Sequence, residues 1–175
     1  MKGIHVAIAT LIVILGSQRS LMCQETFKDV TKVTVGDSCP QFKITSLNGN
    51  EVNISGMKGK VTLINFFATW CKPCQCELPE LESRVWSKYR NNKDFELIVI
   101  GRGHTTKEVL DYKINTKFDM PMYADSARKV YDQFAVKYIP RTFIIDRNGI
   151  VVYSSVNYTE SELQRCLKKL DQLLQ

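Results

Sequence analysis

Two cysteines separated by two residues, Cys71 and Cys74, are the side chains of this sequence best suited to chemistry. Such a pair can close a small disulfide or bind a metal ion, so the spacing alone leaves both open. The flanks favour the disulfide, because residues 61–67 form an apolar, β-rich run and residues 75–89 have the character of a helix. A strand would then deliver the pair to a helix N-terminus. There the helix dipole stabilises a thiolate at Cys71, the species that attacks disulfides.

The other expected elements follow from apolar runs, turn signals and helix caps. An Asn-Gly-Asn turn separates residues 41–46 from 51–54 and predicts a small N-terminal β-hairpin. Residues 95–101 predict a second buried strand, parallel to the first if a helix crosses between them. After it we expect a helix that is capped by Thr105 or Thr106 and ends at about residue 115, and then an extended piece at 120–124. Asp125 or Ser126 would cap a further helix that ends at 134, and residues 141–146 and 150–153 would form a hairpin. A capping box of Thr159 and Glu162 predicts a last helix that ends at about 174.

Several short motifs lie on these elements. In chain order they are Val35-Gly-Asp37, Pro40-x-Phe42, Gly59-Lys60, the run from Asn65 to Cys74, Glu77-Leu-Pro79, the run from Tyr138 to Asp146, and Asn148-Gly149. Together with the element order, they resemble the thioredoxin fold, and more narrowly the exported thioredoxin-like proteins of the TlpA/ResA type. The resemblance covers residues 33–174 as one thioredoxin-like domain. It implies an α/β fold, a central mixed sheet flanked by helices, with the hairpin as an N-terminal extension.

The resemblance implies a role for each residue of the motif. Cys71 would be the exposed nucleophile and Cys74, one helical turn later, the more buried resolving thiol. Trp70 would shield one side of their disulfide. Pro73 would fix φ at the helix start, where its missing N–H costs little.

Ile139 and Pro140 match the family's cis-proline, which faces the two cysteines. The bond would present the backbone of Ile139 to the thiols and to an extended substrate. The simpler alternative is a trans-proline that opens a strand.

Glu77 lies three positions after Cys74, so the two share a helix face. Cytoplasmic thioredoxins carry a buried aspartate at the position of Asn65, which cannot exchange a proton. The resemblance implies that Glu77 replaces it beneath the active site, as a buried carboxyl with a raised pKa that exchanges a proton with Cys74. The helix bend expected at Pro79 would turn Glu77 inward. The alternative is a solvated glutamate that favours the helix dipole.

The remaining cysteines and His104 have no matched redox role. We expect Cys76, Cys39 and Cys166 to be passive, and His104 to be a loop histidine without a partner, although it could approach the active-site rim. A metal site built on Cys71, Cys74 and Cys76 would be crowded, and no second cysteine pair follows. We therefore expect neither a metal nor a cofactor.

Residues 1–23 have the character of a secretory signal, with Lys2 before a short apolar core at 6–15. Cleavage after Cys23, lipidation of Cys23 and an uncleaved anchor all remain open, and each places the domain outside the cytoplasm, in the periplasm or at a membrane. The net charge of +6 would fall to about +4 without this segment. The basic residues are scattered, which argues against nucleic-acid binding.

The sequence thus predicts a monomeric, exported thiol–disulfide oxidoreductase, in which Cys71 attacks a partner disulfide and Cys74 resolves the product. The resemblance implies a reductase with a membrane thiol–disulfide electron donor and disulfide-bearing client proteins, apocytochrome c in cytochrome c biogenesis among them. Two alternatives stay open: a peroxiredoxin, although the expected Pro-x-x-x-Thr-x-x-Cys loop is absent, and a metal-delivery module.

Overall fold

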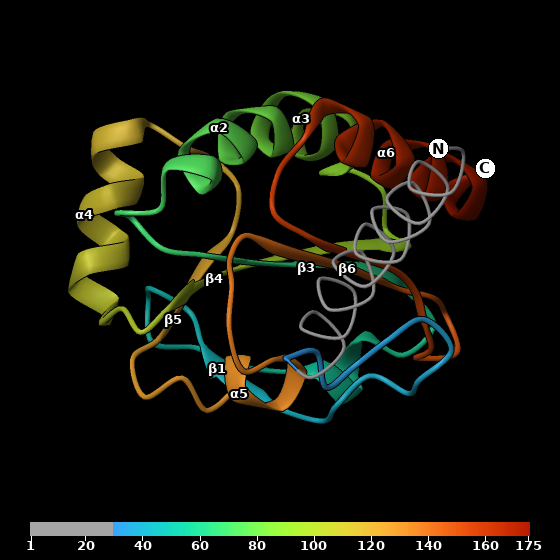
Figure 1. The fold of residues 1–175 in the computed structure, drawn as a ribbon, viewed down its shortest axis with the longest axis horizontal. Coiled ribbons are helices and arrows are strands. Elements are labelled where there is room, and N and C mark those ends of the chain that lie inside the picture. The colour runs from blue at the N-terminus through green and yellow to red at the C-terminus, as the bar shows by residue number, and fades with distance from the viewer. Residues whose placement is uncertain (1–29) are drawn as a thin grey trace, which may run out of the picture.

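The computed structural model describes residues 30–175 and centres on a five-stranded mixed sheet (Figure 1). The signal-sequence expectation and Cys23 lie outside the described residues. The central strand is β3 (Val61–Phe67), with β4 (Phe95–Arg102) parallel to it on one side. The strand order is β5-β4-β3-β6-β7. Strand β5 (Met122–Asp125) runs parallel to β4. Strands β6 (Arg141–Ile145) and β7 (Val151–Val156) form an antiparallel hairpin, and β6 pairs antiparallel with β3. The mixed sheet expected from the sequence is confirmed.

The sheet is buried on both faces, which explains why all seven residues of β3 are apolar or buried. Side chains alternate along the strand: Leu63 belongs to the core beneath α2 and α6, whereas Ile64 and Phe66 belong to the core on the opposite face. In Figure 1 the helices α2, α3 and α6 lie along one face, and α5 and β1 lie on the other. The cysteine pair therefore begins a helix that is packed on the sheet along its length.

The helix after the cysteines starts as α2 (Lys72–Glu80), passes through a π-helical turn, η2 (Leu81–Trp86), and ends as α3 (Ser87–Tyr89). Pro79 lies inside α2 and cannot donate a backbone hydrogen bond. Immediately after it, the Leu81 N–H is shared between the carbonyls of Glu77 and Leu78, and the wider π turn follows. The helix is therefore irregular just after Pro79, where the sequence predicted a bend.

Two helices begin with the caps that the sequence predicts. The N-cap of α4 (Thr106–Thr116) is Thr105, which forms a reciprocal capping box with Glu108. The N-cap of α6 (Glu160–Leu174) is Thr159, whose hydroxyl accepts the Glu162 N–H. The N-terminal hairpin is also confirmed, as β1 (Lys43–Thr45) paired with β2 (Glu51–Asn53), followed by the short 3-10 helix η1 (Ile54–Met57).

The helix expected from Asp125 or Ser126 to residue 134 is wrong in its length. Only α5 (Tyr131–Phe134) is helical. Asp125 is the buried last residue of β5, and its carboxylate accepts the N–H groups of Val130 and Tyr131 across the intervening turn. Arg128 has a positive φ of 59°, which interrupts any helix through this segment. Asp125 thus caps the helix, but from five residues away.

Within residues 30–175, no helix combines the length and apolar character needed to cross a membrane.

Candidate active site

Cys71 and Cys74 form a disulfide at the N-terminus of α2. Cys71 is the N-cap residue, and its sulfur accepts the Cys74 N–H at 3.2 Å. Cys74 is fully buried, whereas Cys71 keeps 5% of its surface exposed. The predicted order of exposure is therefore correct, but Cys71 is more enclosed than expected in this oxidised form. Pro73 lies in the first turn of α2, as predicted.

The loop before β6 covers Cys71. The Ile139–Pro140 peptide bond is cis, as the resemblance implied. The carbonyl oxygen of Ile139 lies 3.8 Å from the Cys71 sulfur. This places the Ile139 backbone against the sulfur that a substrate must reach.

Glu77 lies one helical turn after Cys74 in α2 and is buried in a small polar cluster with Asn65 and Thr142. The Asn65 amide donates to Glu77 Oε2 at 2.8 Å, and the Thr142 hydroxyl donates to Oε1 at 3.0 Å. The Asn65 amide also donates to Thr142 Oγ1 at 2.9 Å. Burial raises the pKa of Glu77 to about 7, although both hydrogen bonds oppose the shift. The alternative of a solvated glutamate is therefore excluded by its burial.

Thr142 was not predicted from the sequence as a site residue. It is the register partner of Asn65 across the antiparallel β3–β6 pair, so the two side chains meet on one face of the sheet. The sequence offered one signal for Thr142, which is its place two residues after Pro140. Its contact with Glu77 and Asn65 depends on the register of two strands that are far apart in sequence, and the sequence does not give that register.

His104 has a partner, contrary to the sequence-based expectation. Its Nε2 accepts the Thr69 N–H at 3.0 Å, and its ring is only 6% exposed. Nδ1 lies 3.7 Å from the Glu108 carboxylate. His104 follows the end of β4 and Thr69 follows the end of the parallel strand β3, so the two meet at one sheet edge. The histidine therefore fixes the segment that leads into Cys71.

The three free cysteines occupy different environments. Cys39 is buried, and burial raises its pKa to about 12. Cys166 is also buried, and burial, with a smaller effect of Glu77, raises its pKa. Cys76 is exposed on α2. Among residues 30–175, no three His, Cys, Asp or Glu side chains are grouped closely enough to hold a metal ion.

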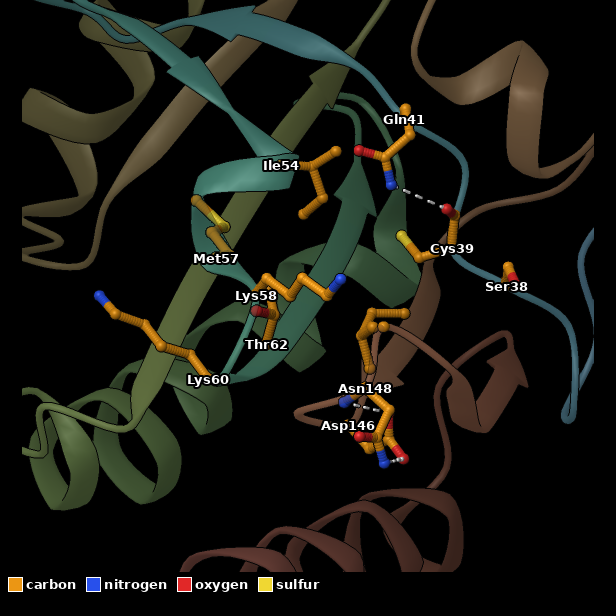
Figure 2. Close-up of a pocket in the computed structure, with 12 residues that line it drawn as sticks. Ser38, Cys39, Gln41, Ile54, Met57, Lys58, Lys60, Thr62, Asp146 and Asn148 are labelled. Atoms are coloured by element: carbon orange, nitrogen blue, oxygen red, sulfur yellow. Dashed lines mark hydrogen bonds between the residues drawn. The ribbon is translucent and has the colours of Figure 1, made fainter.

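A pocket of about 340 Å³ lies away from the cysteine pair, at the opposite end of β3 (Figure 2). Thr62 and Cys39 contribute to its wall, and the Lys58 side chain extends into it while Lys60 points away. Cys39 is the single cysteine among its lining residues, and its raised pKa keeps it in the thiol form. This pocket is therefore separate from the redox site.

Residues 35–154 match the AhpC/TSA family. The chain belongs to this family. Within it, the chain resembles the thiol–disulfide oxidoreductase ResA of Bacillus thuringiensis, with 30% identity over 91% of this chain and 92% of the relative. ResA of Bacillus subtilis is 26% identical over 86% of this chain and 83% of the relative.

The AhpC/TSA member described here also resembles solved structures. A candidate protein disulfide isomerase from Bacteroides thetaiotaomicron is 31% identical, with a TM-score of 0.80 over 83% of this chain and 92% of that one. A candidate thiol:disulfide interchange protein DsbE from Chlorobium tepidum shares the fold, with 24% identity and a TM-score of 0.73 over 82% of this chain and 99% of that one. With its disulfide at the start of α2, this AhpC/TSA member is a thiol–disulfide oxidoreductase with a thioredoxin-like fold.

Proposed function

We propose that the protein reduces disulfides in exported client proteins. The observation that carries this proposal is the Cys71–Cys74 pair at the N-terminus of α2, with the Ile139 carbonyl 3.8 Å from the Cys71 sulfur. A helix N-terminus favours a thiolate at Cys71. The backbone of Ile139 offers an extended client a place to pair beside that thiolate.

The reaction starts from the dithiol. The Cys71 thiolate attacks one sulfur of a client disulfide, forms a mixed disulfide and releases the other client sulfur as a thiolate. Cys74 loses its proton to Glu77 and attacks the Cys71 sulfur. The Cys71–Cys74 disulfide forms, and the second client thiolate leaves. The client gains two electrons, and a dithiol electron donor restores the pair by the reverse exchange.

Glu77 is suited to the proton step because its carboxyl, with a pKa of about 7, both accepts and returns a proton near neutral pH. Four further residues support the site by their position. Trp70 and Pro73 lie close to Cys71 in sequence, and Ile139 and Pro140 cover it from the loop before β6.

Export is supported by the signal-like composition of residues 1–23. One structural neighbour, 20% identical, is an exposed lipoprotein thioredoxin of Streptococcus pneumoniae. We place this protein in the periplasm or at the outer face of a membrane. There a membrane thiol–disulfide protein would supply electrons, and apocytochrome c is one client whose paired cysteines must be kept reduced.

Reduction of insulin disulfides tests the proposal. Cys71→Ser should abolish turnover, and Cys74→Ser should accumulate mixed disulfides because nothing resolves them. Cys76→Ser, which changes an exposed cysteine on the same helix, is the matched control and should retain turnover. Full activity in Cys71→Ser would refute the assignment. Peroxide consumption, measured on the same samples, tests the peroxiredoxin alternative.

A further inference from the structure

A groove of about 380 Å³ opens beside the disulfide. Trp70, Cys71 and Pro73 line it from the start of α2 and the residues just before, and Tyr138 and Ile139 line it from the loop before β6. Trp70 is 65% exposed and Tyr138 is 48% exposed. Large aromatic surfaces left open beside a reactive sulfur are suited to hold a polypeptide segment.

Two cations, Lys72 and Arg102, also line the groove, and no carboxylate does. Within residues 30–175, neither cation forms an ion pair with Asp or Glu. The Arg102 guanidinium stacks on the Tyr131 ring, 4.6 Å from its centroid, which restricts where the charge can lie. The groove therefore presents two positive charges without local compensation.

Two acidic side chains on the elements around Arg102 form other interactions. Asp125 is the register partner of Arg102 on β5, but its carboxylate accepts the N–H groups of Val130 and Tyr131. Asp132 pairs with Arg128. The positive charge of the groove is thus available to a ligand.

We propose that this groove selects client disulfides whose neighbouring residues carry carboxylates. This inference rests on the proposed function, because it names the class of client that the reductase prefers. The client lies extended across Cys71 and pairs with the Ile139 backbone. Its acidic side chains reach Lys72 and Arg102, and an apolar side chain packs on Trp70 or Tyr138.

The expected selectivity is moderate. Exposed ion pairs contribute little each, so two of them correspond to about a 2- to 30-fold preference, and salt should weaken it. Clients with lysine or arginine beside the disulfide should be disfavoured to a similar degree.

The test uses two disulfide-bridged peptides that differ only in their flanking residues, glutamate in one and lysine in the other. Because the preference and the penalty multiply, the full-length protein should show a kcat/KM ratio of at least about 4 in favour of the glutamate peptide at low salt, and this ratio should fall in 0.5 M salt. The double variant Lys72→Gln/Arg102→Gln should bring the ratio to about 1. The double variant Lys72→Glu/Arg102→Glu should invert it. Any effect of Lys72 on the reactivity of Cys71 cancels in the ratio.

Lys58→Gln is the matched control, because Lys58 is an exposed lysine in the separate pocket of Figure 2. It should leave the ratio unchanged. The neutral hydroxyethyl disulfide separates the two proposals. If the protein reduces hydroxyethyl disulfide but shows equal kcat/KM for the two peptides, the client preference alone is overturned. Failure to reduce any of the three disulfides would overturn the proposed function as well.

Discussion

Glu77 occupies a site that accommodates both of its protonation states. Asn65 and Thr142 donate to the carboxylate, while burial opposes its charge, and the balance raises its pKa to about 7. The Asn65 carbonyl oxygen has no hydrogen-bond partner among the described residues. A flip of the Asn65 amide would bring this oxygen to the position of Nδ2, beside Glu77 Oε2, where it would accept from the protonated carboxyl. A group with this pKa exchanges protons near neutrality at little cost.

The raised pKa has a consequence for stability. The folded state favours the protonated form, so this contribution is fully present below the unfolded pKa of about 4.5 and is lost as the pH rises through about 7. The shift corresponds to about 3 kcal/mol. We expect the free energy of unfolding to decrease across this window in the parent protein and to remain flatter in Glu77→Gln, as measured by urea unfolding at a series of pH values. Parallel pH profiles would show that Glu77 titrates normally.

The same substitution should change the thiols. A nearby carboxylate disfavours a second negative charge, so neutralising Glu77 should lower the pKa of Cys74 in the reduced protein. Turnover should also slow, by at most about 10²–10⁴-fold for a positioned proton carrier. Thiolate absorbance against pH, recorded with the rate profile, measures both. Identical titrations and rates in the two proteins would leave Glu77 without a role in proton transfer.

His104 is a positioning residue for the segment that leads into Cys71. His104→Leu removes the acceptor of the Thr69 N–H and should lower the free energy of unfolding by about 1–3 kcal/mol. His104→Gln offers a replacement acceptor and should recover part of the loss. Equal destabilisation by both would show that ring packing against Phe67, not the hydrogen bond, is what matters.

At the scale of elements, local signals predicted the strands and caps closely. The strand expected at 61–67 is β3 without change, and both capping threonines begin helices. The error lies at residues 126–130, where the capping interaction of Asp125 spans a turn. A carboxylate that caps from five residues away leaves no short-range pattern in the sequence.

The helices also set the reactivity of the spare thiols. Cys166 faces inward on α6 and Cys39 is buried, whereas Cys76 faces solvent on α2. Iodoacetamide applied to the native oxidised protein should therefore modify Cys76 and spare Cys39 and Cys166, as read by peptide mass spectrometry. Fast labelling of either buried thiol would mean that its helix or loop opens readily. Replacing all three by alanine should preserve turnover if the mechanism needs two cysteines.

At the scale of the whole molecule, the motif residues were predictable but their supporting partners were not. Cys71, Cys74 and Pro140 carry the resemblance in short, local sequence. Thr142 and His104 reach the site only through strand register and the shared edge of parallel strands. Contacts between residues far apart in sequence depend on the assembled sheet, which no local pattern encodes.

Arg141 also makes contacts with residues far away in sequence, at the start of the described part of the chain. Its guanidinium is fully buried and donates to the carbonyls of Lys137 and Val30 and to the hydroxyl of Thr31. We propose that the folding unit includes residues 30–32, ahead of the start at residue 33 that the sequence predicted. A chain that starts at Val33 should lose about 1–3 kcal/mol of unfolding free energy relative to one that starts at Val30, because buried donors lose their acceptors. Equal urea midpoints with equal slopes for the two chains would contradict this.

Arg141 also directly follows Pro140, and its Nε donates to the Tyr138 carbonyl in the wall of the client groove. One side chain thus joins the groove to Val30 and Thr31, where residues 1–29 attach. In mechanical terms, Arg141 is also the first residue of β6, so tension applied through the N-terminal end would act on the groove wall and on the end of this strand through one buried side chain. If the protein were held to a surface by that end, part of any tension would therefore pass into the wall of the groove.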